Sequence, residues 1–243
     1  MKFTEFDFDP RLVEGIDASG YEDATPVQEQ VIPLILQGKD VIASAQTGTG
    51  KTAAFGLPLL QLIKAEDKFP QALIVCPTRE LCLQITNDLQ DFMKYSKGVS
   101  TEAVYGGASI TMQIRNLRKG VQIVIATPGR LIDLIERKAI DLQKVKYVVL
   151  DEADEMLNMG FRDDIDFVLK NTINRESTWL FSATMPPEVR AIAKNFMSNP
   201  KEITVGKKNT GNVNIDHQYY IASANQRYET LKRLIDFNPG MYG

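Results

Sequence analysis

Residues 45–52 read Ala-Gln-Thr-Gly-Thr-Gly-Lys-Thr and stand between a strand-like run and a helix-like one. The ending is that of a phosphate-binding loop, with Ala45 in the place of the usual first glycine. Its glycines let backbone N–H groups approach phosphate oxygens, and the helix that follows would point its positive end at them. Lys51 is expected on the β- and γ-phosphates, and the Thr52 hydroxyl on Mg²⁺. A chance glycine-rich turn is the alternative.

A second stretch, Asp151-Glu152-Ala153-Asp154, begins 100 residues after Lys51. It follows the apolar run 147–150, which is typical of a buried parallel strand with acids at its carboxyl end. Asp151 would hold the hydration shell of a metal ion, and Glu152 would activate an attacking water. Alone, the stretch could be the acidic start of an exposed helix. Together, the two stretches indicate a Mg-nucleotide triphosphatase site.

Strand-like runs recur along the chain and alternate with segments of helical period. The runs are 40–44, 72–76, 102–105, 122–126, 147–150, 178–181 and 202–205. The helical segments between them include 52–64, 79–95, 109–119, 130–135 and 187–196. This alternation predicts an α/β fold with a mostly parallel central sheet and helices on both faces. Ligands of such folds bind at the carboxyl ends of the strands.

The composition is ordinary for a globular protein. The chain has 243 residues, of which 44% are hydrophobic and 24% charged, and its net charge is −3. The charge gives no global sign of nucleic-acid binding, so any such surface must be local. Cys76 and Cys82 are too few for a metal site and are expected to be reduced. There is no apolar leader and no membrane-spanning stretch, so a cytoplasmic monomer without a membrane partner is expected.

The end of the chain changes in character after residue 205. Residues 206–214 are polar, rich in Gly and Asn, and predict a linker. A strand-like run, 215–221, and a helix-like segment, 226–237, follow but are too short to bury a core of their own. The expected organisation is one domain over 1–205, a linker over 206–214, and the truncated start of a second domain over 215–243. His217 is expected to be structural.

A series of motifs identifies a family. The chain resembles the N-terminal RecA-like half of a DEAD-box ATP-dependent RNA helicase, over about residues 3–205 and more weakly over 206–243. The resemblance rests on Phe3 with Gly20-Tyr21 through Gln28, Ala45 through Thr52, Pro77-Thr78-Arg79-Glu80-Leu81, Gly106-Gly107, Thr127-Pro128-Gly129-Arg130, Asp151 through Asp154, and Ser182-Ala183-Thr184. It implies binding of ATP and Mg²⁺ and contact with RNA.

The resemblance assigns nucleotide contacts residue by residue. They are Tyr21, Gln28, Gln46, Thr47, Gly48, Thr49, Gly50, Lys51 and Thr52. Lys51, Asp151 and Glu152 would be catalytic, and Thr52 and Asp151 would hold the metal, partly through water. Tyr21 would stack on adenine, and the Gln28 amide offers the donor and acceptor that adenine requires. The alternatives are a half-buried core tyrosine and a surface glutamine. The chain departs from the family at Ala24, where a proline is usual, and at Val27, where an isoleucine is usual.

Other residues are assigned to RNA and to coupling. Thr78, Arg79, Gly107, Thr127 and Arg130 would contact the RNA backbone with little sequence preference. Asp154, Ser182 and Thr184 would couple hydrolysis to RNA remodelling. The alternatives are simple turns, a charge pair at a helix start, and capping of the helix near Pro186.

The function implied is RNA unwinding or remodelling driven by ATP binding and hydrolysis. In this family an arginine that completes the site comes from the second domain, so these 243 residues alone are predicted to be nearly inactive. A non-unwinding ATP-dependent RNA clamp is the main alternative. A P-loop phosphotransferase is another alternative, which an acceptor pocket with a lid would support. A DNA helicase is a third, which a preference for DNA strands over RNA strands would support.

Overall fold

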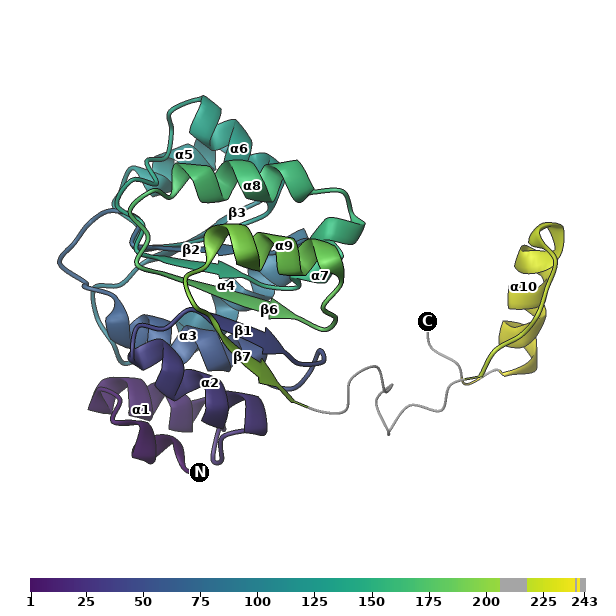
Figure 1. Ribbon diagram of the computed structural model, residues 1–243, viewed down its shortest axis with the longest axis horizontal. Coiled ribbons are helices and arrows are strands. Elements are labelled where there is room, and N and C mark those ends of the chain that lie inside the picture. The colour runs from purple at the N-terminus through teal and green to yellow at the C-terminus, as the bar shows by residue number, and fades with distance from the viewer. Residues whose placement is uncertain (206–217, 239, 241–243) are drawn as a thin grey trace. The chain divides into compact units, whose positions relative to one another are not determined.

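A seven-stranded sheet organises the main part of the chain. The computed structural model describes residues 1–205, 218–238 and 240, and the chain divides into one unit over Met1–Asn209 and another over Thr210–Gly243. The strand order is β3-β4-β2-β5-β6-β1-β7, and every pairing is parallel. Helices cover both faces (Figure 1). The predicted α/β fold is confirmed.

The strands lie within one or two residues of their predicted bounds. They are β1 (Val41–Ser44), β2 (Ala72–Val75), β3 (Thr101–Val104), β4 (Ile123–Ala126), β5 (Tyr147–Leu150), β6 (Ser177–Ser182) and β7 (Lys201–Thr204). The central strands are buried on both faces, which explains why they read as continuous apolar runs. In the register, Val41 of β1 lies opposite Trp179 of β6, and Val149 of β5 lies on the other side of Trp179.

The helices begin, for the most part, where a strand has just ended. They are α1 (Pro10–Ala18), α2 (Pro26–Leu36), α3 (Lys51–Leu62), α4 (Arg79–Phe92), α5 (Ile110–Leu117), α6 (Pro128–Glu136), α7 (Ala153–Asn158), α8 (Arg162–Asn171) and α9 (Pro187–Phe196). A short 3₁₀ helix, η1 (Phe3–Phe6), precedes α1. Because the sheet is parallel, the starts of α3, α4, α6, α7 and α9 gather at its carboxyl edge. That edge carries every predicted motif that follows a strand.

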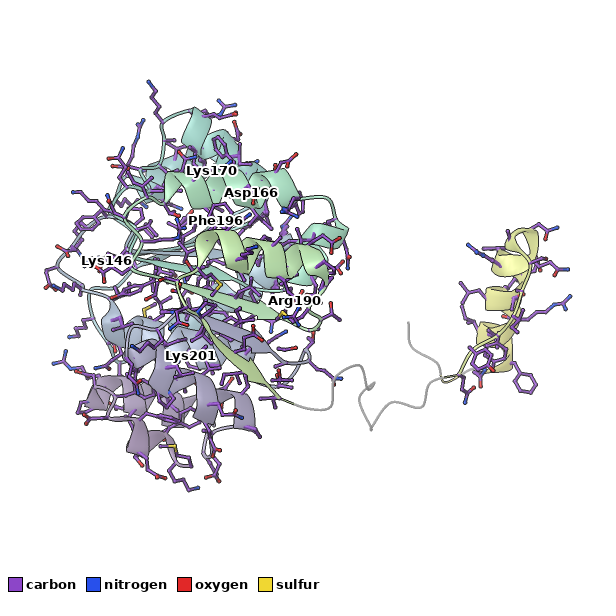
Figure 2. All side chains as sticks on the ribbon, viewed as in Figure 1. Lys146, Asp166, Lys170, Arg190, Phe196 and Lys201 are labelled. Atoms are coloured by element: carbon purple, nitrogen blue, oxygen red, sulfur yellow. The ribbon has the colours of Figure 1, made fainter. Side chains whose placement is uncertain are left out.

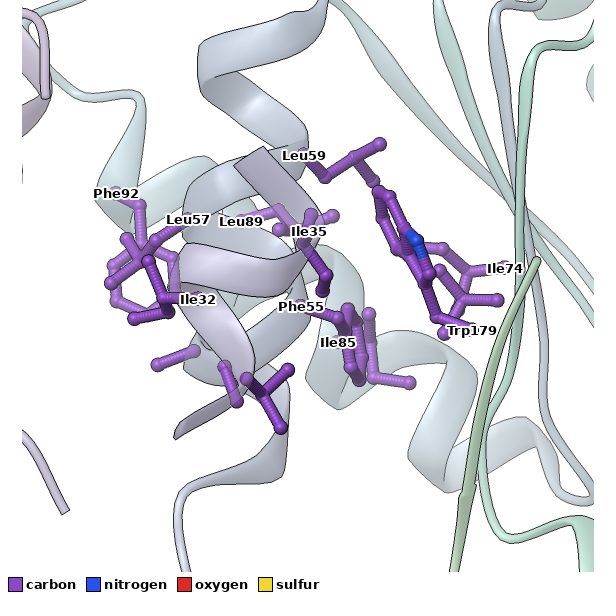
Figure 3. Packing of buried hydrophobic residues seen from close by; sticks show 14 of the residues in the cluster. Ile32, Ile35, Phe55, Leu57, Leu59, Ile74, Ile85, Leu89, Phe92 and Trp179 are labelled. Atoms are coloured by element: carbon purple, nitrogen blue, oxygen red, sulfur yellow. The ribbon is translucent and has the colours of Figure 1, made fainter. Parts of the chain in front are cut away.

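Two apolar clusters fill the space between the sheet and its helices. One cluster lies between one face of the sheet and the four helices α1, α2, α3 and α4. The other lies between the opposite face and the helices α6, α8 and α9. Figure 3 shows Ile32 and Ile35 of α2 and Phe55 of α3 packed in the first cluster, with Trp179 of β6. Trp179 is fully buried, and its Nε1 donates to the Lys39 carbonyl at 3.2 Å. A buried side chain of this size contributes about 1.5–3 kcal/mol or more to stability.

Most charged side chains lie on the outside of this unit, whereas Lys51 and Asp151 are buried. Lys170, Arg190 and Lys201 are exposed on α8, α9 and the edge strand β7 (Figure 2). In the described part of the chain, no helix is long and apolar enough to cross a membrane.

The second unit contains η2 (Ala224–Gln226) and α10 (Arg227–Phe237). The predicted helix is therefore present. Of the strand-like run, only 218–221 are described, and they form no strand, since a lone strand lacks a partner for its backbone groups. The apolar side chains of Tyr228, Leu231 and Ile235 are exposed on α10. The predicted linker 206–214 and His217 lie outside the described residues, and the domain boundaries stay a prediction.

Candidate functional site

The strand order sorts the motifs along the carboxyl edge of the sheet. β6 lies between β1 and β5, so Ser182 stands between the phosphate loop after β1 and Asp151 after β5. On the other side of β5 lie β2, β4 and β3, which carry the motifs predicted to contact RNA. The motifs predicted to bind nucleotide therefore lie toward one end of this edge and those predicted to contact RNA toward the other, with the Asp151–Asp154 stretch between them.

The phosphate loop is closed by its own hydrogen bonds. Gly48 and Gly50 have φ values of +82° and +87°, which favour glycine, and Gly50 precedes the first residue of α3. Thr49 Oγ1 donates to the Gln46 carbonyl at 2.8 Å. Lys51 is only 6% exposed, and its Nζ donates to the Ala45 carbonyl at 3.2 Å. The loop therefore holds a buried cation at the start of a helix, where anions are favoured.

Asp151 lies at the end of β5 in a buried position. Burial raises its pKa to about 6, although the positive charge of Lys51 acts in the opposite direction. Its Oδ1 accepts a hydrogen bond from the Glu152 backbone N–H at 3.0 Å. The structure thus brings the cation of the phosphate loop and the first acid of the second motif into electrostatic contact.

The oxygen donors of this site fit a magnesium ion that also binds phosphates. Magnesium prefers hydroxyl and carboxylate oxygens, usually one or two from the protein, with waters and substrate phosphates completing the shell. Thr52 and Asp151 are such donors. They follow β1 and β5, which are separated in the sheet by β6 alone. Among the described residues, no group of three or more His, Cys, Asp or Glu side chains could hold a metal by itself. Two oxygen donors of this kind are the share that a protein usually supplies to a Mg²⁺ ion whose shell is completed by phosphates and waters.

Glu152 has an unusual backbone conformation. Its φ and ψ are 52° and 49°, in the left-handed region, and it is the residue that precedes α7. A residue with a side chain is disfavoured there by about 1–2 kcal/mol, and such conformations cluster at active sites. The sharp turn directs the chain from β5 into α7, so the first two acids of the motif occupy different surroundings. Asp151 is buried and Glu152 is half-buried.

Asp154, Ser182 and Thr184 form one hydrogen-bonded cluster. Asp154 Oδ2 accepts from the Thr184 hydroxyl at 2.7 Å and from the Thr184 backbone N–H at 2.9 Å. The Ser182 hydroxyl accepts from the Asp154 N–H at 3.3 Å and donates to the Thr184 carbonyl at 2.6 Å. Neither hydroxyl caps α9. Burial works to raise the pKa of Asp154, but the hydrogen bonds from Thr184 and Ser182 outweigh it and leave that pKa below its ordinary value.

The substitution Thr184→Val should destabilise the fold by about 1 kcal/mol at pH 7, since it removes a bond to a half-buried carboxylate. The folded-state pKa of Asp154 is lowered, so the contribution is present above the unfolded-state pKa and is lost as pH falls through the folded value. Urea unfolding should show a constant difference from pH 7 to about pH 5 that shrinks below about pH 4. Thr184→Ser retains the hydroxyl and is the control. Equal midpoints for wild type and Thr184→Val at pH 7 would exclude this role.

Gln28 is fully buried rather than a surface residue of α2. Its Oε1 accepts from the Thr25 N–H at 2.8 Å, and its Nε2 donates to the Gly50 carbonyl at 3.0 Å. Thr25 Oγ1 donates to the Thr49 carbonyl at 2.9 Å. The start of α2 is therefore tied to the phosphate loop. The surface alternative is excluded, and adenine would have to engage an amide that already has two partners.

Tyr21 is half-buried and packs with other aromatic rings. Its ring is edge-on to Phe3 at 6.0 Å and to Phe92 at 5.5 Å between centroids. Burial raises the pKa of the Tyr21 phenol, with a smaller effect from Asp88. Tyr21 is therefore a half-buried core tyrosine, as the alternative interpretation of the sequence has it. The stacking of Tyr21 on adenine stays a prediction.

The part of the edge that carries the motifs predicted to contact RNA contains a hollow of about 490 Å³. Of the residues predicted to contact RNA, Arg79, Thr127 and Arg130 line it. Gly107, with φ +85°, would place a Cβ 3.7 Å from the Arg79 guanidinium. Thr78 does not line the hollow; its hydroxyl accepts from the Leu81 N–H at 3.2 Å and caps α4. Three of the five predicted residues therefore line one concave surface, and Gly107 lies beside one of them, Arg79.

The two arginines of this hollow are held in place. The Arg79 guanidinium lies over the Tyr105 ring at 5.0 Å. Arg130 Nη1 donates to the Ala108 carbonyl at 3.0 Å and to Gln113 Oε1 at 2.8 Å. Positioned cations of this kind lose less side-chain freedom when they bind phosphate.

Sequence reasoning missed two residues that line the same hollow, Asp133 and Phe161. Asp133 lies one turn after Arg130 on α6. Phe161 follows Gly160, whose φ of +87° ends α7 and turns the chain toward α8. Gly160 before Phe161 was the only sequence signal of this turn. It does not indicate that Phe161 would lie beside Arg79 and Arg130.

Residues 25–192 match the family described as DEAD/DEAH box helicase. The chain belongs to the DEAD/DEAH box helicase family. Its sheet, phosphate loop and acidic stretch are those of the RecA-like domain of this family, so the predicted resemblance is confirmed.

Relatives within the DEAD/DEAH box helicases are similar over most of the chain. The DEAD-box ATP-dependent RNA helicase CshA of Streptococcus pneumoniae is 47% identical over 236 residues, which are 97% of this chain and 45% of that protein. CshA of Bacillus subtilis is 46% identical over 236 residues, 97% of this chain and 48% of that protein. The chain thus spans about half the length of the curated relatives it matches.

Two solved structures of similar proteins have the same fold. A DEAD box protein from Methanococcus jannaschii superposes with a TM-score of 0.81 at 39% identity, over 100% of this chain and 65% of that one. A hypothetical ATP-dependent RNA helicase from Sulfolobus tokodaii gives 0.75 at 43% identity, over 82% and 57% of the two chains.

Proposed function

We propose that this chain is the nucleotide-binding domain of an ATP-dependent RNA helicase. The observation that carries the proposal is the order of motifs along the carboxyl edge, where the phosphate loop, Ser182 and Asp151 are adjacent and the arginine-lined hollow lies beyond Asp151. The names of the CshA relatives support the same function.

ATP would bind with its phosphates on the loop 46–52. The backbone N–H groups of this loop and the start of α3 favour the negative charge. Lys51 would exchange its bond to the Ala45 carbonyl for phosphate oxygens. Tyr21 and Gln28 would contact the adenine. Because Gln28 also donates a hydrogen bond to the Gly50 carbonyl, a shift of Gln28 on adenine binding would move the phosphate loop.

Thr52 and Asp151 would hold Mg²⁺, Asp151 partly through water. When bound, the ion neutralises charge on the β- and γ-phosphates. Lys51 adds a positive charge from the protein itself. Its charge also favours the ionised form of the Asp151 carboxylate, against the effect of burial.

Glu152 would accept a proton from the attacking water. Its left-handed backbone conformation separates it from the buried Asp151 and leaves it half-buried, so it can meet a water at the mouth of the site. Phosphoryl transfer depends on positioning and charge stabilisation more than on covalent chemistry. These residues supply both, except for the arginine that the family resemblance places on the second domain.

RNA would lie along the hollow lined by Arg79, Thr127 and Arg130. These groups bind phosphates and sugars rather than base edges, so sequence preference should be weak. Asp154 links the acidic stretch of β5 to Ser182 and Thr184 at the end of β6. A movement of the acidic stretch when nucleotide binds would therefore also move Ser182 and Thr184 through these hydrogen bonds.

Fluorescence anisotropy with a ten-nucleotide uridylate tests the RNA surface. Arg79→Ala and Arg130→Ala should each weaken binding about twofold to fivefold and lower the slope of log affinity against log salt by about 0.7. Arg118→Ala, an exposed arginine after α5, is the matched control. Unchanged affinity and slope in both variants would remove the hollow from the proposal. Tighter binding of the equivalent DNA strand would favour a DNA helicase.

A further inference from the structure

The first residues of the chain pair with the loop that leads into α2. Lys2 and Asp23 form an isolated antiparallel bridge, and the Ala24 N–H donates to the Met1 carbonyl at 2.9 Å. The Lys2 ammonium also contacts the Asp23 carboxylate at 2.9 Å. We refer to residues 1–6 as the strap and to residues 20–25 as the adenine loop.

The bond at Ala24 depends on the residue type at this position. The family pattern has a proline here, which fixes φ and has no N–H to donate. Alanine frees the backbone dihedral, and its N–H is the donor to Met1. The rigidity that a proline ring would supply from within the loop is thus replaced by a tie to the strap.

The strap also places an aromatic ring against Tyr21. Phe3 is 2% exposed and starts η1, and its ring is edge-on to Tyr21. Because Phe3 follows Lys2 directly, the bridge from Lys2 to Asp23 fixes where this ring meets the loop.

The other end of the adenine loop is tied to the phosphate loop. Thr25 donates to the Thr49 carbonyl, and Gln28 donates to the Gly50 carbonyl. Tyr21 thus lies on a segment held at residues 23 and 24 by the strap and at Thr25 by the phosphate loop. Release of the strap would remove the ties at residues 23 and 24 and the Phe3 ring contact, and would leave Tyr21 held by its ring contact with Phe92 and its N–H bond to the Ile16 carbonyl. The segment that carries Tyr21 would then be held less tightly, while the phosphate loop would stay in place.

We propose that Lys2 and Asp23 are positioning residues for base selectivity, which act by holding the adenine loop and Tyr21 in the geometry that receives adenine. This inference rests on the proposed nucleotide function and assigns it two residues outside the phosphate and acidic motifs.

Charge reversal tests the inference. Lys2→Glu, Asp23→Lys and the double variant with both reversals are titrated calorimetrically with Mg-ADP, Mg-GDP and Mg-pyrophosphate, with any purification tag at the C-terminus. Each single reversal should weaken ADP binding about twofold to fivefold and lower the ADP-to-GDP affinity ratio by the same factor. Pyrophosphate binding should not change, and the double variant should recover the wild-type ratio. Lys64→Glu, an exposed lysine just beyond α3, has the same change in net charge as Lys2→Glu and is its control.

Three results would overturn the inference. The first is an ADP-to-GDP affinity ratio in both single variants that equals the wild-type ratio, provided that thermal unfolding shows both variants to be folded. The second is a parallel loss of ADP and pyrophosphate affinity, which would locate the effect at the phosphate loop. The third is a wild-type chain that binds pyrophosphate but does not prefer ADP, which would overturn the adenine assignment together with this inference.

Discussion

The 243-residue polypeptide should hydrolyse ATP about three to five orders of magnitude more slowly than a relative with both domains, even with saturating RNA. In the proposed mechanism the site supplies Lys51, oxygen donors for a cation and Glu152 as a base, but the transition-state charge needs a further arginine. By resemblance, that arginine lies on the second domain. The measurement compares RNA-stimulated phosphate release by this polypeptide and by CshA of Bacillus subtilis under the same conditions.

A variant separates true residual turnover from a contaminating ATPase. Glu152→Gln keeps the size of the side chain and removes the base, so any slow turnover that belongs to this site should fall by about two to four further decades. Brisk turnover by the wild-type polypeptide, about one per second or faster, would show that the site is complete without a second domain.

Lys51→Ala should weaken Mg-ADP binding by about ten- to 150-fold. The lost interaction is a charge-assisted hydrogen bond from a buried cation, worth about 1.5–3 kcal/mol. Lys51 is 6% exposed and lies at the start of α3, so water cannot replace its ammonium group easily. Calorimetric titration with Mg-ADP and with Mg-pyrophosphate measures the effect, and both ligands should lose affinity together.

Lys64→Ala is the matched control for that substitution, since it removes an exposed lysine from the end of the same helical region. It should leave both affinities unchanged. Wild-type binding of ADP by a folded Lys51→Ala variant would show that the phosphates bind elsewhere.

The strands were accessible from the sequence because each buried strand is a short apolar run bounded by polar or glycine residues. Their mostly parallel arrangement was accessible because helical segments alternate with these runs, whereas the order of the strands in the sheet was not predicted. The run 147–150, for example, matches β5 at both ends. α2 is harder to recognise because it is apolar around most of its surface and contains Pro33. α7 is only six residues long and begins after a residue with positive φ, which no periodicity reveals.

The site was predictable where one segment carries its own chemistry, as the phosphate loop and the acidic stretch do. It was not predictable where distant segments meet. Gln28 reads as a polar residue at a helix start, and only the fold shows that it is buried against Gly50, 22 residues away. Phe161 and Asp133 join the hollow of Arg79 because β4 and β5 flank β2, a fact of topology rather than of local sequence.

The central claim is that this site binds an adenine nucleotide through Gln28 and Tyr21 as well as through phosphate. The most direct measurement is calorimetric titration of the wild type and Gln28→Ala with Mg-ADP and Mg-GDP, with Gln30→Ala of the same helix as the control. The ratio of the two affinities is the readout, because disturbance of Gly50 would weaken both nucleotides alike. We expect about a tenfold preference for ADP, from the one hydrogen bond that guanine cannot satisfy, and a ratio near one in Gln28→Ala. Equal binding of ADP and GDP by the wild type, or a preference that survives in Gln28→Ala, would contradict the account.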